Sequence, residues 1–349
     1  MADENRVMNE FPTKISFNAR GIKRFFTDLD AFFADRVLYK TEMIKSWEWF
    51  GQSLLKDSSD YKKAFAGKHG WLFLGNDYNS TIDKLIGLDT AIDRRRSDKF
   101  INRTLKGLDH FPDACKIVIV GPNKASVYAE YLPDFIKPAQ TRYINTLLAG
   151  LKSQGLNVFD PTDLLKAKKN GQPLYFRADT HWNLLGAHLA AEGFFDLYRR
   201  LDPSKAPTGN DLPPVRFFPA DPVRGDLISI GNFLYYQSLS GDNFTIEFDV
   251  PYSTITVAQD GQDQAAAPES FVATPAAGSP TTVINPQAPS KIKVYAFVDS
   301  FSVALSPFLN TAFAEVTYFS HTDLWSKDPS WPDDQAPDLV IFESVERDF

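Results

Sequence analysis

Apolar runs alternate with amphipathic stretches along most of the chain. Short runs rich in branched and aromatic residues predict strands, whereas longer stretches with an apolar residue every three or four positions predict helices. The strands are expected at 71–74, 116–120, 157–160, 291–298, 315–319 and 337–343, and the helices at 92–108, 142–152, 184–201 and 301–310. This alternation favours an α/β class, with a doubly wound, mostly parallel sheet covered by helices on both faces.

The amino-terminal part of the chain has the pattern of helices. Between 21 and 56, apolar residues recur at helical spacing, which core packing explains more simply than a sugar-binding or membrane-facing stripe. With 43% hydrophobic residues, the 349-residue chain can bury a large core. We expect one domain over 1–349 that begins with a helical extension over 1–58.

Two later segments interrupt the alternation. Residues 202–222 are rich in proline and predict a long connection. Within 242–290, the segments 244–250 and 254–258 have the pattern of antiparallel strands, and an Ala-, Pro-, Gly- and Ser-rich tract follows. We expect 242–290 to be a small β-rich insertion that ends in a mobile surface loop over 259–289.

The overall charge is acidic. The chain has 44 Asp and Glu against 37 Lys and Arg, for a formal net charge of −7. No basic run or stripe stands out, and an anionic polymer would need a local basic groove, so we expect no nucleic-acid partner. Cys115 is the only cysteine, which excludes an intrachain disulfide and a site built from several thiolates.

The start of the chain shows no targeting signal. Residues 1–12 are polar, and no run approaches the roughly 18 apolar residues of a membrane span. We therefore expect a soluble chain. Two interpretations of its start remain open, namely a protein that begins here and a piece that begins after a removed anchor.

Two distant blocks contain candidate catalytic residues. The block Asp179-Thr180-His181 sets an acid and a base two residues apart, just before the helix predicted over 184–201. Far downstream, the strand predicted over 291–298 runs into Asp299 and Ser300, where the next helix begins. In parallel sheets, ligands bind beyond the carboxyl ends of the strands, and a helix N-terminus there offers N–H donors to an oxyanion.

These residue types fit serine-based acyl chemistry. A serine hydroxyl needs a base to become a nucleophile, and a histidine held by a carboxylate meets that need. Taken singly, Asp179 is equally a turn or cap residue, His181 a structural histidine and Ser300 a helix cap. Their joint occurrence favours an acyl-transfer site in which Ser300 is the nucleophile, His181 the general base and Asp179 its orienting group.

Four neighbouring residues are candidate substrate contacts. Asn123 and Lys124 follow a predicted strand and could donate to an oxyanion or a sugar hydroxyl, although a turn explains Asn123 equally well. Arg177 could steer an anionic sugar or pair with Asp179. Trp182 could stack on a sugar ring or pack in the core.

Two further histidines offer alternatives. His321 follows the strand predicted over 315–319 and is either a rival base or a surface histidine. His181 and His188 share a helix face without a third convincing ligand, so we predict no metal. The sequence gives no reason to expect a cofactor.

Several blocks resemble the alginate O-acetyltransferase family. The resemblance extends nearly from end to end, and its Asp-Thr-His-Trp-Asn block is specific. The principal blocks are Gly67-Lys68-His69-Gly70-Trp71-Leu72-Phe73, Pro122-Asn123-Lys124-Ala125-Ser126-Val127-Tyr128, Arg177-Ala178-Asp179-Thr180-His181-Trp182-Asn183, Gly225-Asp226-Leu227, Asp299-Ser300-Phe301-Ser302 and Glu343-Ser344-Val345-Glu346-Arg347.

The resemblance implies an SGNH-hydrolase-like domain with a permuted motif order, because the serine block follows the Asp-His block. It also implies that Ser300 carries an acetyl group, that His181 is the general base and that Asp179 orients it. The implied partners are a bacterial exopolysaccharide as acceptor and a membrane-bound acyltransferase that supplies acetyl, in the periplasm. Two alternatives remain open: a carbohydrate acetylesterase with the same triad, and a non-catalytic polysaccharide-binding component of an acetylation complex.

Overall fold

The computed structural model describes residues 61–207, 212–233, 236, 241–270, 273, 276–326, 331 and 336–349. The chain divides after Ser58 into two units, and every described residue belongs to the second, Ser59–Phe349. The helical extension that we expect over 1–58 lies outside the described residues, so it stays a prediction. No helix in the described part of the chain is long and apolar enough to cross a membrane.

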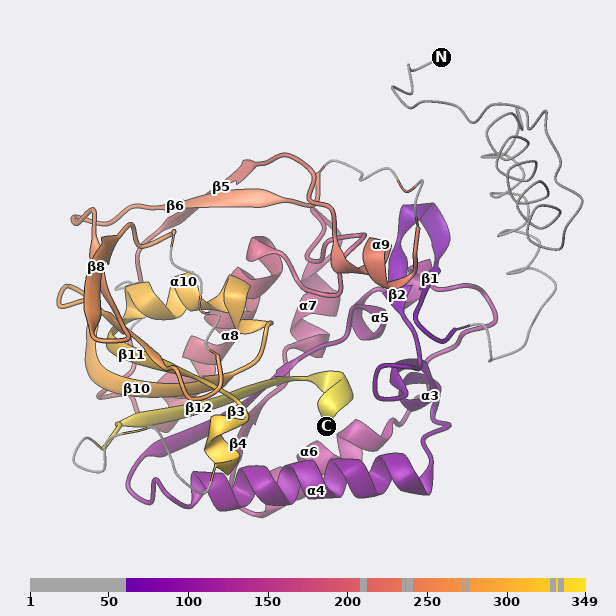
Figure 1. The fold of residues 1–349 in the computed structure, drawn as a ribbon, viewed down its shortest axis with the longest axis horizontal. Helices are drawn as coiled ribbons and strands as arrows, with labels where there is room; N and C mark the ends of the chain where they lie inside the picture. Colours follow the sequence, from indigo (N-terminus) through magenta and orange to yellow (C-terminus); the bar gives the residue numbers. More distant parts are fainter. Residues whose placement is uncertain are drawn as a thin grey trace, which may run out of the picture. The chain divides into compact units, whose positions relative to one another are not determined.

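The described residues form an α/β fold around an eight-stranded sheet (Figure 1). Its strands are β3 (Cys115–Gly121), β4 (Asn157–Phe159), β7 (Ile255–Gln259), β8 (Gln262–Ala266), β9 (Thr281–Ile284), β10 (Ser290–Val298), β11 (Phe313–Ser320) and β12 (Leu339–Val345). They lie in the order β4-β3-β12-β10-β11-β9-β7-β8. The first five of these strands run parallel to one another, which confirms the predicted mostly parallel sheet.

Helices cover both faces of the sheet. Figure 1 shows α4 (Ala91–Leu108) and α6 (Tyr143–Ser153) below it, and α8 (Leu184–Leu201) and α10 (Ser302–Ala312) above it. Successive side chains of a strand point to opposite faces. In β10, Val294, Ala296 and Val298 accordingly belong to the core under α8 and α10, whereas Tyr295 and Phe297 belong to the core over α4 and α6. The near-continuous apolar run of β10 thus reflects burial on both faces.

Shorter elements surround this framework. The short helices are α3 (Thr81–Ile86), α5 (Lys124–Val127), α7 (Thr162–Lys168) and α9 (Asp226–Ile230), with 3-10 turns η2 (Lys68–Gly70), η3 (Ala129–Tyr131), η4 (Asp323–Trp325) and η5 (Glu346–Asp348). Two small antiparallel sheets pair β1 (Ala64–Ala66) with β2 (Leu72–Leu74), and β5 (Val215–Pro219) with β6 (Phe244–Phe248). Strand β5 lies inside 202–222, where we predicted only a connection.

The insertion predicted over 242–290 is strand-rich, as expected, but most of it belongs to the main sheet. Strands β7, β8 and β9 extend the sheet beyond β11, and β9 pairs with β11 in antiparallel orientation. The expectation of a surface loop over 259–289 is therefore wrong for β8 and β9. The physical reason is the open edge of β11, because alternate residues of β9, Thr281 and Val283, are buried when the strand pairs there.

Candidate active site

Ser300 lies at the carboxyl edge of the parallel strands, between β10 and α10. Its turn is held by the carboxylate of Asp299. The Oδ1 atom of Asp299 accepts a hydrogen bond from the Phe301 N–H at 2.8 Å, and its Oδ2 atom accepts one from the Val345 N–H at 2.8 Å. Ser300 itself is exposed. Asp299 thus holds a turn that presents the Ser300 hydroxyl at the edge where parallel sheets bind ligands.

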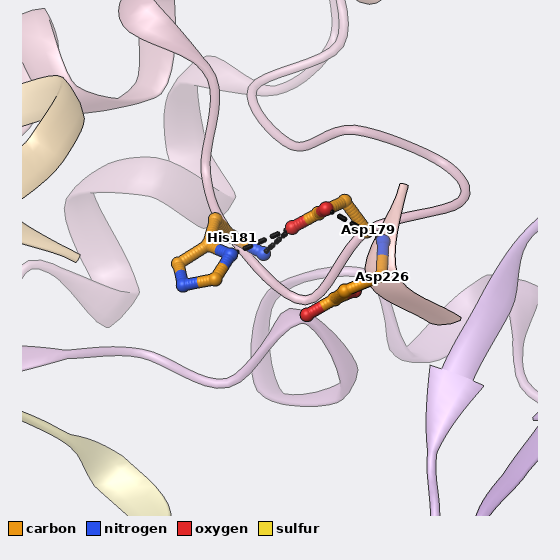
Figure 2. Close-up of side chains that lie close together, drawn as sticks. All are labelled: Asp179, His181 and Asp226. Atoms are coloured by element: carbon orange, nitrogen blue, oxygen red, sulfur yellow. Dashed lines mark hydrogen bonds and ion pairs between the residues drawn. The ribbon is translucent and has the colours of Figure 1, made fainter. Parts of the chain in front are cut away.

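The structure brings the three predicted catalytic residues into one hydrogen-bonded chain. The Nε2 atom of His181 lies 2.8 Å from Ser300 Oγ, and its Nδ1 atom lies 2.6 Å from Asp179 Oδ1. Figure 2 shows the imidazole next to the Asp179 carboxylate. A carboxylate on Nδ1 fixes the tautomer in which Nε2 accepts a proton, so the geometry is that of an acid–base relay ending at a serine.

The surroundings of Asp179 favour its ionised form. Its Oδ1 atom also accepts from the His181 N–H at 3.0 Å, and its Oδ2 atom accepts from the Asp226 N–H at 2.8 Å. Burial favours the neutral acid, but the hydrogen bond and charge of His181 outweigh burial and lower the pKa of Asp179 to about 2. The carboxylate is therefore charged at neutral pH and can stabilise an imidazolium at His181.

Asp226 supports this loop, a role that reasoning from the residues missed. Its carboxylate accepts from the Thr180 N–H at 2.8 Å and from Thr180 Oγ1 at 2.6 Å. Gly225 permits the close approach, because a Cβ atom there would lie 2.1 Å from the Ala178 carbonyl oxygen. The available signal was the short Gly225-Asp226-Leu227 block, which carried no chemistry of its own.

Three potential metal-ligand atoms meet at this loop. Within the described residues, single atoms of Asp179, His181 and Asp226 lie within 4.8 Å of one another (Figure 2). Asp179 and His181 bind each other directly, and both Asp226 oxygens bind Thr180. A cation would have to replace these bonds, so the donor set fits a hydrogen-bonded relay better than a metal site. The absence of a metal stays a prediction.

Lys124 lies behind the same loop. It is buried, and its ammonium donates to the carbonyl oxygens of Phe176 at 3.0 Å, Arg177 at 2.9 Å and Asp179 at 2.7 Å. The prediction that Lys124 contacts substrate is therefore wrong, because its donors hold the backbone that carries Asp179 and His181. Burial lowers the pKa of Lys124 to about 7, against the attraction of Asp179 and neighbouring acids.

Replacing Lys124 with methionine is expected to destabilise the fold. Three buried carbonyl groups lose their shared donor, so we expect the Lys124→Met variant to lose roughly 2–4 kcal/mol of the free energy of unfolding. Urea denaturation measures this loss. Lys168→Met, at an exposed position of α7, is the matched control and should change stability little. Equal stability of the two variants would contradict the positioning role.

The effect of this substitution should depend on pH. The pKa of Lys124 is about 7 in the fold against 10.5 for a free lysine, so between these values the unfolded chain holds a proton that the folded chain has released. The stability that wild type owes to this group therefore increases as pH rises through that window. Denaturation should show a larger loss for Lys124→Met at pH 9 than at pH 6.5, and a smaller loss at pH 9 would contradict the shift.

Trp182 packs in the core and does not face a ligand. It is fully buried, and its Nε1–H donates to the Phe301 carbonyl oxygen at 2.8 Å. The two rings also meet edge to face, with centroids 5.3 Å apart. Of the two alternatives for Trp182, core packing is therefore confirmed, and sugar stacking is wrong. Trp182 instead ties the His181 loop to the start of α10, since Phe301 directly follows Ser300.

Two donors at this edge are available to an oxyanion. The Asn123 N–H donates to Glu346 at 2.9 Å, and its Oδ1 atom accepts from Arg347 at 3.3 Å. Arg347 thereby orients the Asn123 amide. Within the described ranges, neither the Asn123 Nδ2 group nor the Ser300 N–H has a hydrogen-bond partner. Asn123 therefore remains a candidate contact for substrate.

The remaining candidates are placed as follows. Arg177 is half-buried, and its main-chain N–H donates to the Asp242 carboxylate at 2.8 Å. A contact between Arg177 and substrate stays a prediction. His321 donates its N–H to the Val298 carbonyl oxygen at 2.9 Å, and His181 is the histidine that contacts Ser300. The Nε2 atom of His188 lies 3.7 Å from Oε1 of Glu192, which is one helical turn further along α8.

A family model and several solved structures resemble this chain. Residues 64–233 match the model described as an SGNH hydrolase-like domain, acetyltransferase AlgX. This segment contains Asp179, His181 and Asp226, whereas Ser300 lies beyond it. A search of curated proteins finds no match.

The solved structures share the fold at low sequence identity. The O-acetyltransferase domain of Pseudomonas putida AlgJ is 18% identical, with a TM-score of 0.51 over 82% of this chain and 91% of that one. Bacillus cereus PatB1 is 13% identical, with a TM-score of 0.54 over 80% and 94%. A DHHW family protein from Eubacterium siraeum is 17% identical, with a TM-score of 0.55 over 81% and 93%. Residues 64–233, just under half of the chain, thus resemble the SGNH hydrolase-like acetyltransferase domains that AlgX represents.

Proposed function

We propose that the protein transfers acetyl groups to hydroxyls of a bacterial exopolysaccharide through an acetyl-Ser300 intermediate. The observation that carries this proposal is the unbroken hydrogen-bonded chain from Asp179 through His181 to Ser300, in a domain of an acetyltransferase family. Other support is the exposure of Ser300, which leaves the hydroxyl open to a large acceptor.

In the first half of the reaction, the acetyl group moves from its donor to Ser300. Ser300 Oγ attacks the acetyl carbonyl carbon while His181 Nε2 takes the hydroxyl proton. The carbonyl oxygen becomes an oxyanion, which the Ser300 N–H and Asn123 Nδ2 stabilise as donors. The tetrahedral intermediate collapses, and the leaving group departs with the proton from His181. Asp179 stabilises the imidazolium in between.

In the second half, an acceptor hydroxyl takes the place of the donor. His181 Nε2 removes its proton as the oxygen attacks the acetyl carbon. Collapse of the second tetrahedral intermediate breaks the bond to Ser300 Oγ, which regains its proton from His181. Water in place of the sugar would give an acetylesterase with the same residues, so the two activities differ only in the acceptor.

Product analysis separates the two activities. We expect that the protein, given a small acetyl ester as donor and neutral and acidic oligosaccharides as acceptors, yields an acetylated oligosaccharide that mass spectrometry detects. The Ser300→Ala variant is the matched control. Release of acetate with no acetylated product from any acceptor would contradict the transferase and favour the esterase. Delivery of acetyl by a membrane-bound acyltransferase, and a periplasmic location, remain parts of this proposal that rest on the resemblance.

A further inference from the structure

Helix α4 carries a basic face that lines a cavity. Arg96, Lys99 and Arg103 follow one another at helical spacing and are exposed. They line a cavity of about 320 Å³, together with Phe100 and Trp325. The expectation that the chain has no basic stripe is therefore wrong. Its members are three to four residues apart in a chain of net charge −7, so they form a stripe only when the segment is helical.

The exposed cations of this cavity, which we call the α4 cavity, are not held in ion pairs with neighbouring acids. Among the described residues, no carboxylate forms an ion pair with Arg96, Lys99 or Arg103. Arg94 on the same helix differs, because it binds Asp89 at 2.6 Å. Unpaired cations gathered in one hollow create a local positive potential that attracts anions.

The acidic residues that line the α4 cavity are already engaged. Asp93 forms a capping box with Thr90 at the start of α4, where its carboxylate accepts a hydrogen bond from the Thr90 N–H at 2.8 Å. Asp348 accepts from Asn79 at 2.7 Å. Both carboxylates are bound by uncharged donors and form no ion pair with the exposed cations. The cavity lining has four basic side chains, those of Lys84, Arg96, Lys99 and Arg103, against two acidic ones, so its formal charge is positive.

The α4 cavity lies at the same edge of the sheet as Ser300. His321, one of its lining residues, donates its N–H to the carbonyl oxygen of Val298, two residues before Ser300. Asp348, another lining residue, follows Arg347, which binds the side chain of Asn123. The strands β10, β11 and β12 are neighbours, so the loops after them form both the cavity and the site.

The lining chemistry fits an acidic sugar. Guanidinium and ammonium groups bind carboxylates through charge-assisted hydrogen bonds, and aromatic rings such as Phe100 and Trp325 offer apolar surface to a sugar ring. The volume is at the lower end of the roughly 300–1,000 Å³ of small-molecule sites. Lys99 and Arg103 also line a second hollow with Arg95 and Lys106, so the basic face continues about 15 Å along α4.

We propose that the α4 cavity is a subsite for a carboxylate-bearing unit of the acceptor glycan, next to the unit acetylated at Ser300. This assignment rests on the proposed function for the identity of the acceptor. The binding of an acidic sugar at α4 can be measured without any acetyl transfer, so the two proposals can fail separately.

Titration calorimetry on the Ser300→Ala variant tests the subsite. The probe is hexagalacturonate, and maltohexaose is the uncharged comparison. We expect hexagalacturonate to bind more tightly than maltohexaose, with an affinity that falls as salt rises. Adding Arg96→Gln, Lys99→Gln and Arg103→Gln together should weaken hexagalacturonate binding by about tenfold or more.

A second triple variant controls for net charge. Lys152→Gln, Lys168→Gln and Arg200→Gln remove three exposed cations on α6, α7 and α8, and should leave hexagalacturonate binding unchanged. Thermal unfolding checks that both triple variants fold. Equal binding of hexagalacturonate and maltohexaose, or equal effects of the two triple variants, would overturn the subsite. Loss confined to the α4 variant supports it, whether or not the protein proves to transfer acetyl.

Discussion

The Ser300→Ala variant is expected to lose acetyl-ester cleavage and acetyl transfer by about 10⁴-fold or more. Ser300 Oγ is the atom that His181 Nε2 contacts at 2.8 Å, and alanine leaves the base without a nucleophile. The turn should persist, because Asp299 holds it through the main chain of Phe301 and Val345. Initial rates with a chromogenic acetyl ester measure the loss.

The same substitution at another position controls for Ser300→Ala. Ser153 is exposed at the end of α6, where its hydroxyl donates to the Gly150 carbonyl oxygen. Ser153→Ala should retain wild-type activity. If Ser300→Ala also retained it, another group would have to be the nucleophile and the proposed mechanism would be wrong.

The Asp179→Asn variant is expected to lower kcat by roughly 10³- to 10⁴-fold. The asparagine is neutral, so it no longer stabilises an imidazolium at His181. Its side-chain NH₂ can also face His181 Nδ1, which then accepts instead of donating and leaves Nε2 protonated. In that tautomer Nε2 cannot take the proton of Ser300. Asp163→Asn, at an exposed position of α7, is the matched control.

The same residue predicts an effect of acid on stability. The pKa of Asp179 is about 2 in the fold against 3.8 for a free aspartate, so the folded chain holds the ionised form more strongly. The resulting stabilisation is complete above about pH 4 and is lost as pH falls through 2. Denaturation should therefore show Asp179→Asn losing stability relative to wild type at pH 7 and converging towards it at pH 2. A constant difference between the two would contradict the depressed pKa.

The parts of the fold predicted correctly are those whose pattern is local. The helix expected over 184–201 has these bounds in the structure, because Asn183 caps it by accepting from the Gly186 N–H. The strand expected over 291–298 differs from β10 by one residue. The edge strand β8 could not be predicted, because its polar and small residues form a strand only through pairing with β7. Strand β9 has β-branched residues, but it lies in the Ala-, Pro-, Gly- and Ser-rich tract that favoured a loop.

In the candidate site, too, the residues with a local sequence signal could be predicted and those that depend on tertiary contacts could not. Asp179, His181 and Ser300 could be named because their residue types and the ends of their elements already indicate chemistry. The supporting roles of Lys124 and Asp226 depend on which loops the fold brings together. The sequence does not show that these loops lie close to the loop of Asp179 and His181. Both sugar stacking and core packing stayed open for Trp182, because an aromatic residue beside a catalytic histidine has the same sequence pattern whether it is buried or exposed.

The central claim is that Ser300 carries the acetyl group, and trapping this intermediate tests it most directly. The protein is mixed with a small acetyl ester, quenched in acid, digested and examined by peptide mass spectrometry. We predict an acetyl group on Ser300 in the wild type. Loss of this acetyl group when an oligosaccharide acceptor is added would show that the acetyl-Ser300 form reacts with the acceptor. An active wild type that forms product with no acetyl group on Ser300 at any time before the steady state would contradict the account.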